Sequence, residues 1–180
     1  MTTILTPREA EALDNHAEQQ ARAQLSSIRD MLAAYQLDWD RLEELRDQRA
    51  DHEADMADQT DPKPWVIACP DEAEELADLE ESAGDYASQD EALQAMLENP
   101  LDISFRSGWA SSREDMQPEE FQILLCTGGP AVRIMGELDF SGSPYRAWLE
   151  FQDWGTPWTH YYEEGAADVL LDYAQLIICL

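Results

Sequence analysis

The sequence has very little positive charge. It holds a single lysine, Lys63, and 11 Lys and Arg residues against 39 Asp and Glu residues, which gives a formal net charge of −28. Nucleic acids and anionic membranes are themselves polyanions, so this imbalance argues against direct binding of the chain to either. It favours a basic partner, such as a nucleic-acid-binding groove, a polycation or metal ions.

Cysteine is also scarce, and long apolar runs are absent. Cys69, Cys126 and Cys179 are odd in number and far apart, so they predict neither a disulfide framework nor a metal site, and we expect reduced thiols. No run approaches the ~18 apolar residues of a membrane span. Met1–Arg8 lacks the pattern of a signal peptide. We therefore expect a cytoplasmic protein, and no motif predicts a cofactor.

The chain nevertheless has the means to fold. Apolar residues make up 44% of it and include six tryptophans, which excludes a purely acidic disordered chain. A length of 180 residues suits one domain, or one domain with an appendage. The sequence leaves the oligomeric state open.

The most prominent feature is a long segment without cations, between Lys63 and Arg106. In residues 71–102, apolar residues recur at helical intervals and leave carboxylates on the opposite side. If residues 71–81 are helical, their acids supply about one charge per 2.4 Å of axis, against about one per 1.7 Å for duplex DNA. The candidate partner-binding acids are Asp71, Glu72, Glu74, Glu75, Asp78, Glu80 and Glu81, with a second strip of Asp47, Asp51, Asp55 and Asp58.

The order of the expected elements predicts an α+β fold. Residues 1–60 should form a helical hairpin, with Thr6 and Asp38 as N-caps. Residues 61–100 should form an acidic helical segment, in which 65–69 is a short strand or a packed link. Residues 101–180 should form a small antiparallel β-sheet with a C-terminal helix, and we expect the three parts to fold together.

The sheet is predicted from alternation and turn signals. Apolar and polar residues alternate or cluster in short runs between turn residues, about every ten positions. The expected strands are 101–109, 121–127, 131–138, 145–153 and 158–163, and the final helix starts at Gly165. We interpret Thr127–Pro130 as a tight turn, because no Gly-Lys-Ser/Thr follows it as in a phosphate-binding loop.

No arrangement of residues predicts catalysis. Paired carboxylates are too frequent to single out an acid/base pair, and the three histidines share no spacing. The densest other cluster is aromatic. We expect it mainly to form core, with an exposed interaction patch as the alternative. Its members are Trp148, Trp154, Trp158, Tyr161 and Tyr162.

One block of sequence resembles a known group of proteins. Ile123–Leu138 (ILLCTGGPAVRIMGEL), Arg146–Trp154 (RAWLEFQDW) and Thr156–Trp158 (TPW) are similar to a block in small uncharacterised accessory proteins of phages, plasmids and integrative elements. The resemblance covers about a quarter of the chain and implies an origin in a mobile element. It carries no catalytic residues. In composition, the chain also looks like DNA-mimic anti-restriction and anti-CRISPR proteins.

These observations support three hypotheses. The first is a non-enzymatic inhibitor that presents carboxylates to a basic nucleic-acid-binding protein of a host defence complex. The second is a protein–protein interaction or regulatory module whose acidity serves solubility. The third is an enzyme with a carboxylate-bound metal. Separately, we expect the carboxylates between Lys63 and Arg106 to repel one another and to have raised pKa values, because no cation lies near them in the sequence.

Overall fold

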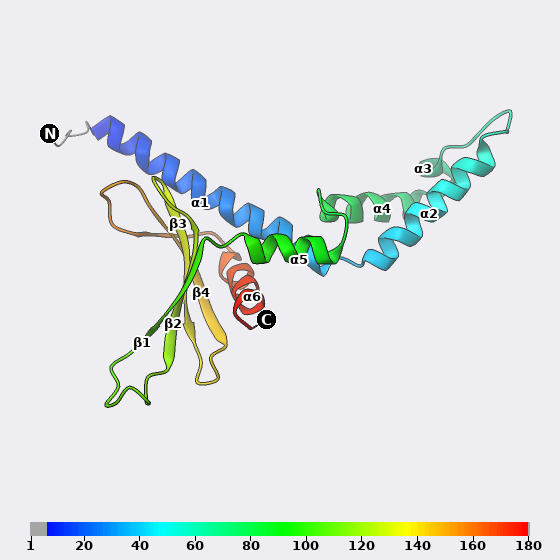
Figure 1. Ribbon diagram of the computed structural model, residues 1–180. Helices are drawn as coiled ribbons and strands as arrows, with labels where there is room; N and C mark the ends of the chain where they lie inside the picture. The colour runs from blue at the N-terminus through cyan, green and yellow to red at the C-terminus, as the bar shows by residue number, and fades with distance from the viewer. Residues whose placement is uncertain (1–6, 180) are drawn as a thin grey trace. The chain divides into compact units, whose positions relative to one another are not determined.

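The computed structural model confirms the α+β class. It describes residues 7–179, and the side chains of residues 16–179; the predicted Thr6 cap lies outside this range. The helices are α1 (Pro7–Gln36), α2 (Trp39–Met56), α3 (Trp65–Ala68), α4 (Pro70–Ala83), α5 (Gln89–Glu98) and α6 (Ala166–Cys179) (Figure 1). The Asp38 cap is present, and its carboxylate accepts the backbone N–H of Arg41 at 3.0 Å. None of the described helices is long and apolar enough to cross a membrane.

The five predicted strands form one antiparallel meander in the order β1-β2-β3-β4-β5. Their bounds are β1 (Asp102–Ser107), β2 (Pro118–Cys126), β3 (Ala131–Leu138), β4 (Pro144–Gln152) and β5 (Thr159–Tyr161). Thr127–Pro130 is the turn between β2 and β3, and Gly128 there has φ +125°, a value that L side chains rarely adopt. Residues 65–69 are not a strand: Trp65–Ala68 is the short helix α3.

The chain divides into two compact units. The first, here called the sheet unit, contains residues 1–29 and 95–180. The second, here called the acidic unit, contains residues 30–94. Helices α1 and α5 therefore each contribute residues to both units.

The sheet unit has a core on one face of the sheet. Burial alternates along β3, where Val132, Ile134, Gly136 and Leu138 are buried and the residues between them are half-buried. Helix α6 packs against β4 on this face, and its Tyr173 is fully buried. Helix α1 is tied to the end of β5, since Arg29 Nη1 lies 2.5 Å from Glu163 Oε1. The opposite face of the sheet, here called the outer face, has no described helix packed against it.

The acidic unit has a much smaller core. Leu42 and Leu45 of α2 pack with Leu76 and Ala83 of α4, and Leu37, Trp39 and Leu79 pack around them. In this unit, α2 packs against α3 and α4. The sequence pattern predicted a helical hairpin within residues 1–60 and did not predict these contacts.

One backbone position in the sheet should tolerate no side chain. A Cβ on Gly136 would lie 2.2 Å from a ring carbon of Phe121 and 2.3 Å from the carbonyl oxygen of Arg146. Phe121 is buried and the carbonyl belongs to the sheet ladder, so neither can move freely. We expect Gly136→Ala to lower the free energy of unfolding by about 1–3 kcal/mol. Chemical denaturation measures this. Gly142→Ala is a comparison variant without a steric clash, since nothing lies within 4 Å there, and its φ of +84° means that it reports only the cost of backbone strain.

Candidate partner-binding surfaces

The acids of α4 are not equivalent, because arginines of α2 neutralise some of them. Arg41 donates from Nε and Nη2 to the two carboxylate oxygens of Glu75, at 2.9 and 2.7 Å. Arg46 Nε and Arg49 Nη2 lie 3.2 and 3.6 Å from Glu80 Oε1. These pairs flank the apolar contact between the two helices. Two of the seven predicted α4 acids therefore hold α4 to α2.

For Glu75, the predicted direction of the pKa shift is wrong. The hydrogen bonds from the Arg41 guanidinium lower the pKa of this carboxyl below its ordinary value. The expectation of raised values rested on the lack of cations between Lys63 and Arg106. It overlooked cations that lie 34 positions away in sequence but face α4 in the fold.

The outward face of α4 carries the acids that remain. Asp71, Glu74, Asp78 and Glu81 recur at intervals of three, four and three residues, which places them on one helical face, and all four are exposed. Among the described residues, none of them forms an ion pair. Glu72, the remaining predicted acid, is half-buried. These acids give the face about one charge per 5 Å of helix axis. A single DNA strand has a higher charge density, with one charge per about 3.4 Å.

A second acidic face runs along α2, directed away from its apolar contact with α4. Asp47, Asp51 and Asp55 are exposed on it at intervals of four residues. Asp40 and Glu44 extend the same face toward the N-terminus of α2, because their spacing in the sequence continues the same helical period. Asp58 lies past the last residue of α2, Met56, and so is not part of this helical face.

The two acidic faces lie on opposite sides of the α2–α4 pair, since each helix directs its apolar stripe at the other. The structure therefore does not merge the predicted strips into one surface. The acidic unit contains 21 Asp and Glu residues against four Arg and Lys, a net charge of −17 in 65 residues. Most of the charge of the chain is thus in the unit with the smaller core.

The outer face of the sheet has a different chemistry. The register places Arg106, Glu120, Glu137 and Arg146 in one row across β1 to β4, where Arg106 pairs with Glu120 and Arg146 with Glu137. In a parallel row, Arg133 Nη2 lies 2.7 Å from Glu150 Oε2. The arginines here are matched by acids, so this face is nearly neutral.

Aromatic rings cover the β4–β5 side of the outer face. The guanidinium of Arg133 lies 3.9 Å from the ring centroid of Trp158, and His160 stacks on Tyr162 at 4.3 Å. Of the five aromatic residues expected to be mainly core, only Tyr161 is buried. Trp154 and Tyr162 are exposed, and Trp148 and Trp158 are half-buried.

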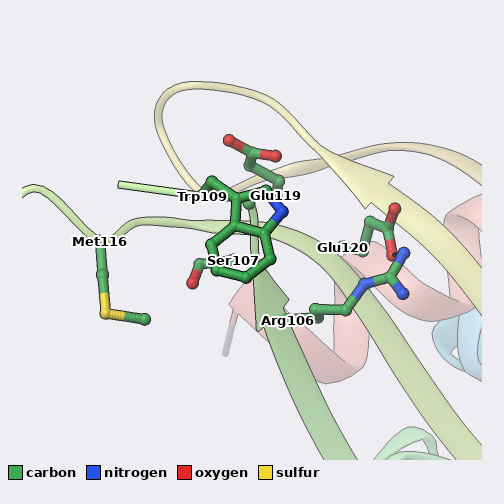
Figure 2. Close-up of a pocket in the computed structure, with 7 residues that line it drawn as sticks. Arg106, Ser107, Trp109, Met116, Glu119 and Glu120 are labelled. Atoms are coloured by element: carbon green, nitrogen blue, oxygen red, sulfur yellow. Dashed lines mark ion pairs between the residues drawn. The ribbon is translucent and has the colours of Figure 1, made fainter. Parts of the chain in front are cut away.

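An open pocket of about 470 Å³ lies at the turn after β1. Figure 2 shows the indole of Trp109 near Ser107 and Glu119, with Met116 to one side and Arg106 next to Glu120. Trp109 is fully exposed. Nothing in the sequence pattern predicted this pocket, since the turn residues carry no periodic signal.

The described residues show no metal centre and no disulfide. Among them, no group of three or more His, Cys, Asp and Glu side chains is placed to hold a metal ion. Cys69, Cys126 and Cys179 are free thiols.

Comparison with known proteins gave no match: no family model, no curated protein and no solved structure is significantly similar to this chain.

Proposed function

We propose that the protein is a mobile-element-encoded inhibitor that occupies the DNA-binding groove of a host defence protein. The observation that carries the proposal is the unneutralised acidic face of α4, in a unit with a net charge of −17. A basic groove supplies the cations that this face lacks in the described structure.

The thickness of the acidic unit supports the proposal. Two helices packed 8–10 Å apart, each 10–12 Å wide, form a body of about 20 Å. The acids of α2 and α4 lie on opposite sides of this body, as the phosphates of the two strands lie on opposite sides of a duplex. A groove shaped for duplex DNA can therefore contact both acidic faces at once.

The mechanism is electrostatic competition. Cations in the partner contact Asp71, Glu74, Asp78 and Glu81, while Glu75 and Glu80 keep α4 attached to α2. Such an interaction forms fast by electrostatic steering, and salt weakens it. The inhibitor needs no chemistry of its own.

We expect the quadruple variant D71N/E74Q/D78N/E81Q to lose at least tenfold in its ability to displace duplex DNA from its target. Fluorescence anisotropy of a labelled duplex, bound to purified restriction and RNA-guided nucleases, measures the displacement. The slope of log affinity against log salt should fall by about one for each carboxylate that no longer pairs with a cation of the partner.

The matched control is E114Q/E164Q/D168N/D172N, which removes the same charge from exposed positions of the sheet unit. An equal loss in both variants would show that only overall charge matters. Displacement that is unchanged between low and about 0.5 M salt would refute electrostatic competition.

The second candidate function is a protein–protein interaction module, and the outer face of the sheet favours it. Exposed Tyr162 and Trp154, with arginine stacked on Trp158, have the composition of interface hot spots. Arg133→Ala with Trp158→Ala would then abolish partner binding, while the quadruple α4 variant would leave it intact.

A further inference from the structure

Strand β1 is an edge of the sheet that no other described segment covers. It pairs only with β2, and its residues are exposed from Asp102 to Arg106. The other edge strand, β5, has only three residues, and its Tyr161 hydroxyl lies within hydrogen-bond distance, 3.4 Å, of Arg22 Nε. A long, exposed edge presents unpaired N–H and C=O groups that can pair with another strand.

The side chains of β1 are unusual for a free edge. Ile103 and Phe105 are 38% and 52% exposed, although the register places them on the same side of the sheet as the buried Ile123 and Phe121. Leu101, just before the strand, is 59% exposed. The other side of the strand carries an acid at one end, Asp102, and a base at the other, Arg106.

This pattern is complementary to itself. When two identical edge strands pair antiparallel, one residue must lie opposite its own copy, and the pair is centred on that residue. The reason is that only every second residue of an edge strand directs its N–H and C=O groups outward, so residues can pair only with others of the same alternation. Centring on Ser104 places Asp102 opposite Arg106 and Ile103 opposite Phe105, each twice by symmetry. Centring on Phe105 instead puts Arg106 opposite Ser104 and leaves Ile103 opposite Ser107. Centring on Ile103 leaves Arg106 outside the paired segment.

We propose that β1 pairs antiparallel with β1 of a second copy of this chain, centred on Ser104, so that two five-stranded sheets become one. The two-fold axis is perpendicular to the sheet, and the interface is isologous. Each opposite pair stabilises the dimer as cross-strand pairs do within a sheet. Arg106 is mostly exposed beyond its contact with Glu120, so its remaining donors are free to bind the second copy's Asp102.

The pocket at the turn after β1 adds to this interface. In the proposed register, Leu101 of the second copy lies opposite Ser107, which lines the pocket together with Trp109 and Met116 (Figure 2). All three apolar side chains are exposed in the single chain. Pairing brings them together at both ends of the joined strands.

Charge-swap variants test the proposal by analytical ultracentrifugation. We expect the wild-type chain to dimerise with increasing concentration at about 0.15 M salt, where the Debye length of ~8 Å screens the remote acids of the two copies. D102R alone and R106D alone should each raise the dimer dissociation constant at least tenfold. An equimolar mixture of the two should dimerise again, because one copy then presents two arginines and the other two aspartates.

R146D is the matched control. It breaks the ion pair with Glu137 in the same row of the sheet, but on the interior strand β4, and should leave dimerisation unchanged. Circular dichroism melts show whether each variant folds. A wild-type chain that stays monomeric up to its solubility limit overturns the proposal. So do single variants that dimerise like the wild type, or a mixture of folded single variants that stays monomeric.

Discussion

Tyr173→Ala should lower the free energy of unfolding of the sheet unit by about 3–5 kcal/mol. Among the described residues, Tyr173 is the largest fully buried side chain. Its hydroxyl donates to the carbonyl oxygen of Met96 at 3.2 Å and accepts from Asn99 Nδ2 at 3.0 Å. The variant therefore loses both packing and the hydrogen bonds that hold the end of α5 against α6.

Two further variants separate these contributions in chemical denaturation experiments. Tyr173→Phe keeps the ring and removes only the hydroxyl, so we expect a loss of about 1–3 kcal/mol from the buried polar groups left without a partner. Tyr162→Ala removes a ring that is 83% exposed and should change stability by less than about 0.5 kcal/mol. A Tyr173→Ala variant as stable as Tyr162→Ala would contradict the structure of this core.

The pH dependence gives an independent check. Burial raises the pKa of Tyr173 to about 12, from about 10 in an unfolded chain. The folded state then holds the proton of Tyr173 more tightly than the unfolded state does. The stability that comes from this difference is fully present below about pH 10 and is lost as the pH rises toward 12. Stability of the wild type should fall over this range more steeply than that of Tyr173→Phe.

The sheet could be predicted from the sequence because its signals are local. Alternation in Ala131–Leu138 and the turn glycine Gly128 identify strand and turn without knowledge of neighbours. The sequence did not predict helix α3, because Trp65–Ala68 has the apolar composition of a short strand. Only four residues separate Pro64 from Cys69, too few to show a helical period. Val66 and Ile67 are exposed there, so no core dictates the conformation.

The division of the α4 acids could be predicted only in part. The outward face of Asp71, Glu74, Asp78 and Glu81 follows from helical spacing alone. The neutralisation of Glu75 depends on Arg41, and that contact exists only because Leu42 and Leu45 pack on Leu76. A segment without cations in sequence is therefore not a segment without cations in space.

Glu74→Gln and Glu75→Gln, neighbouring substitutions of the same kind, should shift the melting temperature of the acidic unit in opposite directions at pH 7.5. Glu74 has no cation among its described neighbours, so removing its charge relieves repulsion in a unit with a net charge of −17. Glu75 accepts two hydrogen bonds from Arg41, so removing its charge breaks the link between α2 and α4. We expect a higher melting temperature for Glu74→Gln and a lower one for Glu75→Gln.

Salt and acid extend this last test, with thermal melts followed by circular dichroism. Added NaCl screens the repulsion and should raise the melting temperature of the wild type. Because the pKa of Glu75 is lowered in the folded state, its stabilising contribution is present above its unfolded value of about 4.3 and is lost as the pH falls through the folded value. Stability should therefore decline as the pH falls below about 4.3, and the decline should be weaker in Glu75→Gln than in Glu74→Gln. A melting temperature that falls with added salt would mean that ion pairs, and not repulsion, dominate this unit, and that its outward acids are not held ready for a basic partner.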